Sequence, residues 1–242
     1  MKISTGSSYL DQWLEGGYER DIITTFYGPA GSGKTNLCLM AAANIAKEKK
    51  VIFIDTEGGF SVERLKQIIS EDIMKNIFLL KATNFSEQRE AFNKLLDLIK
   101  EDIGLIIVDS IVMLYRLELG QANQEKDKEK IQLINKSLVR QMRILNEIAR
   151  KKQIPILITD QVYSEFLSRE DFEAGKPKPV SMVGGDIMKY WSKCIIELQN
   201  IGKNKKRAIL RKHRSLPEKD IIFIITNKGI FAERKRKLFR FF

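Results

Sequence analysis

The 242-residue sequence has few of the side chains on which many enzyme sites depend. His213 is its only histidine, which argues against Ser-His-Asp or Cys-His catalysis and against a zinc enzyme. Cys38 and Cys194 lie too far apart in sequence for a paired metal motif and are typical of reduced core residues in a cytoplasmic protein. The sequence has no run of ~18 apolar residues and no apolar signal segment. It therefore predicts neither a membrane span nor export.

Charge is unevenly distributed along the chain. Lys and Arg number 42 against 31 Asp and Glu, a formal net charge of +11. Residues 203–242 hold 14 basic and 3 acidic residues, so this segment carries the whole excess and residues 1–202 are balanced. A basic segment on a neutral body favours a polyanionic partner such as DNA, and a solubilising surface is the alternative that composition leaves open.

Strand-like and helix-like segments alternate over the first 160 residues. Repeated strand–helix–strand units predict an α/β fold with a mainly parallel central sheet flanked by helices. The expected strands are 22–27, 51–55, 78–80, 105–108 and 154–159, and the expected helices are 36–46, 62–73, 88–99 and a long one from about 130 to 148 that begins in the charged stretch 124–130.

The pattern changes after Gln161. Clustered glycine and proline predict a long loop over 163–186, and loops of that length in compact domains usually have a function. Three short strands are expected at 194–198, 207–210 and 221–225, with a turn at 227–229, as a small C-terminal β meander. We expect a single domain over 1–242.

One segment between the first strand and first helix matches the phosphate-binding loop (Walker A, or P-loop) at all eight positions. Glycines let backbone N–H groups turn onto phosphate oxygens, the helix adds its positive end, the lysine contributes a charge and the threonine a hydroxyl for Mg²⁺. The sequence therefore predicts ATP and Mg²⁺ as cofactors. The predicted ligands are Gly28, Pro29, Ala30, Gly31, Ser32, Gly33, Lys34 and Thr35.

Three polar residues at strand ends complete the expected site. Asp109 follows the apolar run 105–108, where a carboxylate can hold Mg²⁺ directly or through water. Glu57 follows the strand after the phosphate-loop helix and is expected to activate or position water. Gln161 ends a later strand at the same sheet edge.

Together with the phosphate loop, several short segments resemble the RecA-type recombinases of archaea, and most of all a short paralogue of the RadA strand-exchange protein. The resemblance implies a RecA-like P-loop ATPase core over about 3–200, with Glu57 as the catalytic glutamate and Gln161 as the sensor of the γ-phosphate. It also implies that Arg64 lies near the adenine. The segments are Ser4-Thr5-Gly6, Leu10-Asp11, Glu15-Gly16-Gly17, Ile54-Asp55-Thr56-Glu57-Gly58, Val108-Asp109-Ser110 and Thr159-Asp160-Gln161-Val162.

The chain also departs from that family. We expect no N-terminal DNA-binding domain and no Phe-containing linker, because the core begins at residue 3. The loop after Gln161, a DNA-contacting loop in recombinases, has balanced charge and is a poor phosphate ligand. The resemblance thus implies a DNA-binding accessory protein of recombination and DNA repair in the cytoplasm, associated with the nucleoid, with weak ATPase activity and no autonomous strand exchange.

Lys212 stands where filament-forming relatives place an acidic residue that caps a neighbour's ATP, and Arg214 follows two residues later. On a strand they would point to the same side. We expect them to reach a γ-phosphate across a subunit interface, or else to contact DNA or solvent.

The C-terminal tail combines cations with aromatic residues. It is expected to bind the sliding clamp through its Leu-x-x-Phe-Phe spacing, to pack on the protein's own core, or to stack on single-stranded bases. Lys235 stands where the clamp-binding motif normally has glutamine. The residues concerned are Arg234, Lys235, Arg236, Lys237, Leu238, Phe241 and Phe242.

Two other functions are compatible with the sequence. ATP could control docking to a RadA-type recombinase, a Holliday-junction nuclease or a DNA polymerase, with DNA contact incidental. A KaiC-like signalling ATPase shares the core, but such chains usually join two cores and have no basic end. Whether the protein forms homo-oligomers stays open.

Overall fold

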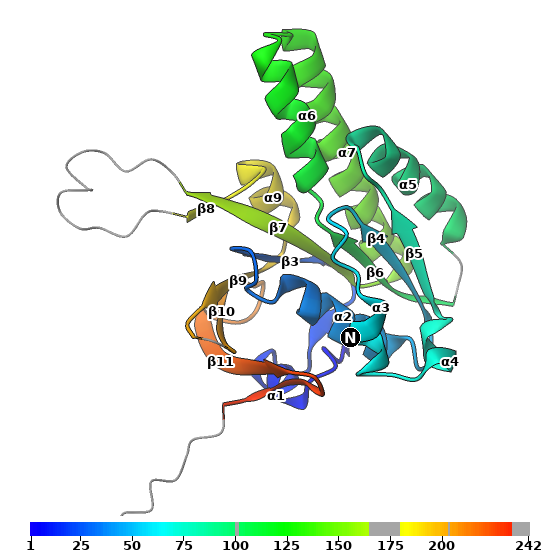
Figure 1. Cartoon of the computed structure of the whole chain (residues 1–242), viewed down its shortest axis with the longest axis vertical. Helices are drawn as coiled ribbons and strands as arrows, with labels where there is room; N and C mark the ends of the chain where they lie inside the picture. The colour runs from blue at the N-terminus through cyan, green and yellow to red at the C-terminus, as the bar shows by residue number, and fades with distance from the viewer. Residues whose placement is uncertain (100–101, 165–179, 203, 234–242) are drawn as a thin grey trace, which may run out of the picture.

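The computed structural model describes residues 1–99, 102–164, 180–202 and 204–233, and Figure 1 shows their arrangement. A ten-stranded sheet has the order β12-β11-β10-β9-β3-β7-β6-β4-β5, with β8 paired to β7. The six strands from β9 to β5 are parallel to one another. These strands are β9 (Cys194–Asn200), β3 (Ile23–Gly28), β7 (Ile156–Ser164), β6 (Ile103–Asp109), β4 (Lys50–Asp55) and β5 (Ile77–Lys81).

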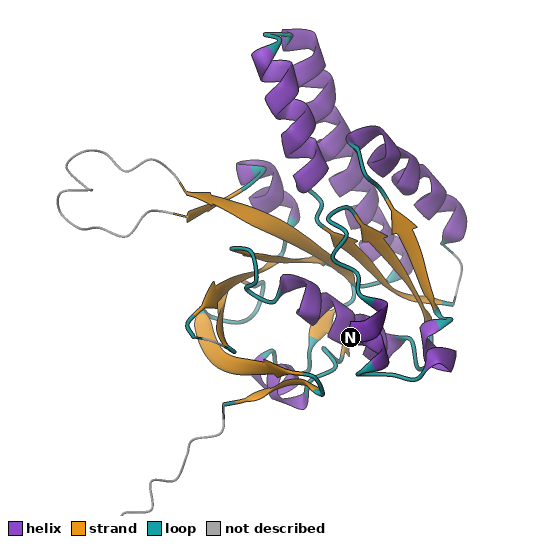
Figure 2. Cartoon of the chain, viewed as in Figure 1, coloured by secondary structure: helices purple, strands orange, loops and turns teal. Residues whose placement is uncertain are grey.

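Helices cover both faces of this sheet, as Figure 2 shows. One buried cluster joins the sheet to α5 (Phe85–Leu98), α6 (Met113–Gln124), α7 (Lys128–Lys152) and α9 (Gly185–Trp191). The other joins it to α1 (Ser8–Trp13), α2 (Lys34–Ile45) and α3 (Val62–Lys66). The central strands β3, β4 and β6 are buried along almost their whole length because both of their faces are covered. The predicted α/β fold with a mainly parallel sheet flanked by helices is confirmed.

Two of the expected helices differ from the sequence prediction. The segment 62–73 forms two short helices, α3 and α4 (Glu71–Met74), because the Ile68 N–H turns back to the Leu65 carbonyl and Ser70 takes the N-cap position of α4. The long helix α7 begins at Lys128, within the charged stretch 124–130 as expected, but this stretch also includes the end of α6 at Gln124 and the turn 125–127. Asp127 caps α7 by accepting from the Lys130 N–H at 2.9 Å.

Three helices were missed. The sequence indicated none of α1, α6 and α9. In α6 the apolar residues that follow β6 run directly into a polar stretch containing Gly120, so helical periodicity is weak. The packed pair α6 and α7 extends beyond the sheet in Figure 1.

The predicted loop over 163–186 is shorter than expected. β7 continues to Ser164 and pairs antiparallel with β8 (Val180–Met182), and α9 begins at Gly185. The charged residues on which the loop's charge balance depends lie mostly in 165–179, outside the described residues.

The C-terminal meander is confirmed, and as expected it extends the main sheet. It comprises β10 (Lys205–Lys212), β11 (Lys219–Thr226) and β12 (Gly229–Ala232), and β10 pairs antiparallel with β9. Phe223 is fully buried, and the Ser7 hydroxyl donates to the Ile230 carbonyl at 2.8 Å. The meander thus contributes to the same core as α1 and α2.

The N-terminal segment adds a small sheet of β1 (Lys2–Ile3) and β2 (Tyr18–Glu19). Both cysteines are buried free thiols, as expected. Within the described residues, no helix has the length and apolar character that crossing a membrane would require.

Replacing Phe223 with alanine is expected to lower the free energy of unfolding by about 3–5 kcal/mol, since the change leaves a cavity in the core. Phe231→Ala, in the same meander but 47% exposed, is the matched control and should cost less than about 1 kcal/mol. Urea titration followed by circular dichroism measures both. If Phe223→Ala melted the meander in an early, separate transition, the meander would not belong to the common core.

Candidate phosphate-binding site

The phosphate loop joins the buried strand β3 to the N-terminus of α2. Gly28 allows the chain to pass close to β9, because a Cβ atom there would lie 2.2 Å from the Leu198 carbonyl oxygen. Gly33 has a φ of +104°, and a Cβ atom there would lie 2.8 Å from the Ile225 Cδ1 atom. The loop therefore needs glycine both for its backbone geometry and for its close packing against the C-terminal meander.

Lys34 is buried beneath this loop. Its ammonium donates to the carbonyls of Gly28 at 2.8 Å and Pro29 at 3.1 Å. Burial lowers the pKa of Lys34, whereas the nearby carboxylates of Glu57 and Asp109 oppose that shift. The amine lines a cavity of about 390 Å³ at the N-terminus of α2, a position suited to phosphate oxygens.

Thr35 and Asp109 lie together, as a Mg²⁺ site requires. The Thr35 hydroxyl donates to Asp109 Oδ2 at 2.7 Å, and the Thr159 hydroxyl donates to Asp109 Oδ1. Asp109 is 1% exposed, and burial raises its pKa while the two hydroxyl donors lower it.

These oxygens fit Mg²⁺, which is commonly held by one or two protein groups together with phosphates. The described residues hold no cluster of three or more His, Cys, Asp or Glu that could bind a metal alone. Mg²⁺ bound here would therefore take some of its ligands from the phosphates of a nucleotide.

Glu57 and Gln161 meet at the mouth of the cavity. Gln161 Nε2 donates to Glu57 Oε1 at 2.8 Å, and both side chains line the cavity with Lys34 and Thr35. Asp55 holds the loop that carries Glu57 by accepting from the N–H groups of Glu57 and Gly59 at 3.2 and 3.1 Å. The structure thus brings the two predicted polar residues into direct contact.

Arg64 is held by protein groups. Its guanidinium donates to Asn36 in α2, to Gln67, and to the Asn227 carbonyl in the turn after β11, at 2.9, 2.8 and 3.0 Å. Its Nη2 atom is buried without a hydrogen-bond partner among the described residues. This side chain links α2 to the meander, and its contact with an adenine stays a prediction.

Asp160 is a buried acid beside the site that sequence reasoning did not single out. It is fully buried in the middle of β7, and neither carboxylate oxygen has a hydrogen-bond partner within the described part of the chain. The N–H groups of Gln161 and Val183 lie nearby without hydrogen-bond geometry. Burial raises the pKa of Asp160 well above its ordinary value, and the charge of Lys34 opposes that rise.

The meander adds two residues to the cavity that the sequence did not indicate, Asn204 and Lys206. They lie some 170 residues after the loop, and no motif marks them. Only the pairing of β10 with β9, and of β9 with β3, brings them there.

Lys212 and Arg214 lie at the opposite edge of the sheet, away from the phosphate loop. β10 ends at Lys212 after an irregularity in its pairing, so the expected alternation does not extend to Arg214. Lys212 donates to the Lys189 carbonyl at 2.6 Å, and Arg214 makes two 2.7 Å contacts with Asp21. A contact with a neighbouring subunit's nucleotide stays a prediction. The tail residues 234–242 lie outside the described residues.

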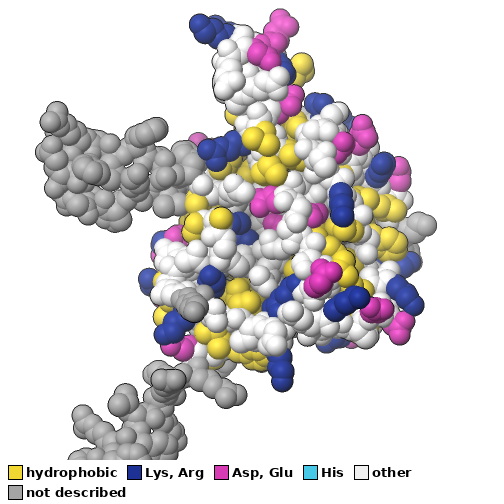
Figure 3. Space-filling view, viewed as in Figure 1, with side chains coloured by type: hydrophobic (Ala, Val, Ile, Leu, Met, Phe, Trp, Pro, Cys, Tyr) yellow, Lys and Arg dark blue, Asp and Glu magenta, His cyan; other side chains and the backbone are white. Residues whose placement is uncertain are grey.

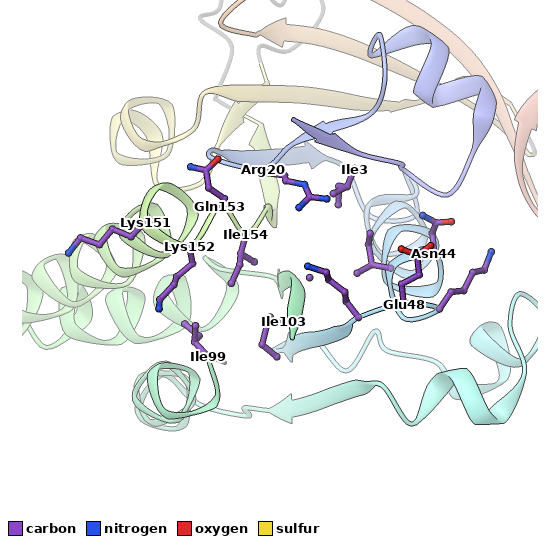
Figure 4. A pocket seen from close by; sticks show the side chains of 14 residues that line it. Ile3, Arg20, Asn44, Glu48, Ile99, Ile103, Lys151, Lys152, Gln153 and Ile154 are labelled. Carbon is purple, nitrogen blue, oxygen red and sulfur yellow. The ribbon is translucent and has the colours of Figure 1, made fainter. Parts of the chain in front are cut away.

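A second cavity, of about 510 Å³, opens at that opposite edge and is shown in Figure 4. Its lining includes Arg20, Lys47, Lys49, Lys151 and Lys152. The last turn of α7 supplies Lys151 and Lys152, and Lys47 and Lys49 follow the end of α2. Cations are favoured at helix C-termini because the helix dipole is negative there, which accounts for most of this charge.

Comparisons with known proteins agree with this geometry. The model of the Rad51 family matches residues 1–233. The chain is 41% identical to the "DNA repair and recombination protein RadB" of Methanobrevibacter smithii, over 95% of each chain, and 38% identical to the protein of that name from Methanocaldococcus jannaschii, over 91% of this chain and 98% of the relative. A solved structure, "Crystal structure of the RadB recombinase", superposes with a TM-score of 0.76 at 33% identity, covering 96% of this chain and all of that one. The predicted resemblance to a short RadA paralogue of archaea is confirmed.

Replacing Asp160 with asparagine is expected to raise the free energy of unfolding at neutral pH by about 1–3 kcal/mol, because it removes a buried, unpaired carboxyl. A carboxyl with a raised pKa in the folded state is destabilising once pH rises above its ordinary value. The gain should therefore shrink as the pH falls toward that value. Urea unfolding across acidic to neutral pH measures it, with the exposed Asp97→Asn as control. A gain independent of pH would contradict this account.

Proposed function

The chain belongs to the Rad51 family, and on that premise we propose that it is an ATP-binding and DNA-binding accessory protein of recombination and DNA repair. The observation that carries the nucleotide part is the 2.7 Å contact of Thr35 with Asp109, directly below the phosphate loop. The names of the relatives support the repair and recombination part. We further propose weak ATPase activity without autonomous strand exchange.

Each residue of the site has a proposed part in hydrolysis. Backbone N–H groups of the loop and the ammonium of Lys34 bind phosphate oxygens. Thr35 and Asp109 would hold Mg²⁺, which neutralises charge on the phosphates when it is bound. Glu57 accepts a proton from the attacking water or orients it, and Gln161, which already contacts Glu57, holds that carboxylate in place.

The geometry also supports a weak rather than a fast ATPase. Glu57 is exposed, and its hydrogen bond with Gln161 is open to solvent. Fast phosphoryl transfer generally needs a site from which water is excluded and in which charges are held in place. Arg214 is one of the two cations expected to act on a neighbour's nucleotide. Its guanidinium is held by hydrogen bonds to Asp21 and Glu19.

The DNA surface is proposed to lie mainly in the tail. Lys and Arg mix with Asp and Glu on the face shown in Figure 3, with no patch of one sign. Five cations of the meander segment already pair with acids, several of them from the body of the chain. These are Lys205, Arg207, Arg211, Arg214 and Lys219. Residues 234–242 contain five cations and no acid, so much of the remaining excess charge is there.

Protein partners are proposed on the resemblance alone. This role implies partners of four classes: a RadA-type recombinase, a Holliday-junction nuclease, a DNA polymerase or the sliding clamp. Self-association is compatible with the same role. The tail sequence with Leu238, Phe241 and Phe242 is the segment proposed for the clamp.

Replacing Glu57 with glutamine is expected to leave the affinity for MgATP within a few-fold and to lower single-turnover hydrolysis by about 100-fold or more, because the amide cannot accept a proton. Glu63→Gln, an exposed position a few residues along, is the matched control and should hydrolyse at the wild-type rate. Calorimetry and phosphate release measure the two quantities. Hydrolysis by Glu57→Gln at the wild-type rate would remove Glu57 from the reaction.

A chain that ends at Glu233 is expected to bind single-stranded DNA more weakly at low salt and with a shallower salt dependence, since each cation lost from a phosphate contact lowers the slope by about 0.7. This version keeps β10–β12, which the core requires. Fluorescence anisotropy, with and without MgATP, measures the affinity. A full-length variant with Phe239, Phe241 and Phe242 changed to alanine separates base stacking from charge. Equal affinity and slope for all three chains would place the DNA surface elsewhere.

A further inference from the structure

A second lysine, Lys206, reaches the phosphate loop from the C-terminal meander. Its ammonium donates to the Gly31 carbonyl at 2.7 Å and to Asn200 Oδ1 at 2.6 Å. It lines the same cavity as Lys34, Glu57 and Gln161. Two lysines distant in sequence therefore face one space of about 390 Å³.

The backbone holds Lys206 in this position. Lys206 is the register partner of Asn200, at the end of β9, and β9 lies beside β3, which leads into the loop. Asn200 Nδ2 donates to the Ala30 carbonyl at 3.3 Å, and Ile225 of β11 packs against Gly33. Three neighbouring strands, β9, β10 and β11, thus contact the loop, so the lysine is supplied by a paired part of the sheet.

The charge of Lys206 is not neutralised by these contacts. Both of its acceptors are uncharged amide oxygens. Its neighbours on β10 differ, because Lys205 pairs with Glu233 and Arg207 pairs with Asp220. Among the described residues, Lys206 has no carboxylate partner although the residues on both sides of it do. A cation in that state, directed into a cavity, is suited to an anionic ligand.

We propose that Lys206 is a second phosphate-binding lysine, which contacts the phosphate chain of the nucleotide from the same polypeptide that supplies the loop. The inference rests on the proposed function, since it takes a nucleoside polyphosphate as the ligand of the cavity. Lys206 contacts Gly31 of the phosphate loop and lines the cavity together with Lys34, so its ligand is the phosphate chain rather than the base. The meander is then part of the nucleotide site as well as of the core.

A structural role makes a different prediction. If Lys206 only held the loop through the Gly31 carbonyl, its loss would weaken every nucleotide alike, and a neutral donor of similar length would replace it. If Lys206 binds phosphate, the affinity lost on replacing it grows with the number of phosphates in the nucleotide. Only a positively charged side chain then restores that affinity. Lys206→Gln distinguishes the two, because the glutamine amide can still donate to Gly31 but carries no charge.

The experiment measures the affinities of full-length wild type, Lys206→Gln and Lys206→Arg for MgATP, ADP and AMP by calorimetry. Lys206→Gln should lose about ten-fold or more in affinity for MgATP, the size expected of a charged hydrogen bond, and much less for AMP. Lys206→Arg should keep most of the affinity. Lys205→Ala removes one cation from the adjacent position, whose side chain points to the other face of the strand, and should bind as wild type does.

The outcomes separate this inference from the proposed function. If wild type binds MgATP and Lys206→Gln binds it equally well, Lys206 is not a phosphate ligand and the proposed function stands. An equal loss for ATP and AMP, with a lowered melting temperature, would show a structural role and overturn the inference. If wild type binds no MgATP, both proposals fail together.

Discussion

The hydrogen bond from the Thr35 hydroxyl to the Asp109 carboxylate is the interaction on which the rest of the structure depends. It joins the first turn of α2 to the end of β6, and Asp109 is 1% exposed. A carboxylate buried this deeply is costly unless polar donors or a cation lie beside it. The parallel sheet meets this requirement because the carboxyl ends of β3, β6, β4 and β7 share one edge, where Thr159 also donates to Asp109.

The C-terminal meander connects that edge to the core. Phe223 packs in the interior, while Ile225 and Lys206 contact the phosphate loop from neighbouring strands. Ion pairs also neutralise part of the positive charge of the meander segment, because Arg211 binds Glu197 and Arg214 binds Asp21. A segment that composition marks only as basic is therefore divided into residues that stabilise the sheet, one that faces the cavity at the phosphate loop, and a tail proposed to bind DNA.

The fold was predictable from local pattern where burial makes the pattern strong. The runs that became β4 and β6 are largely apolar because helices cover both faces of the sheet, and α7 shows a regular apolar stripe. Prediction failed where tertiary contacts outweigh local pattern. α6 packs on α7 although its apolar residues show weak helical periodicity. The break between α3 and α4 is set by the hydrogen bond from the Ile68 N–H to the Leu65 carbonyl and by Ser70 at the N-cap of α4.

The sequence by itself determined the contiguous part of the site. Eight successive residues define the phosphate loop, and single acids or amides after apolar runs identify Asp109, Glu57 and Gln161, since parallel strands end at one edge. Only the tertiary structure decided which distant side chains join them. The order in which β10, β9 and β3 pair brings Lys206 to Gly31 and takes Lys212 and Arg214 to the opposite edge, and burial is the main cause of the raised pKa of Asp160. Strand order and burial depend on contacts between segments far apart in the chain, which no local pattern of residues records.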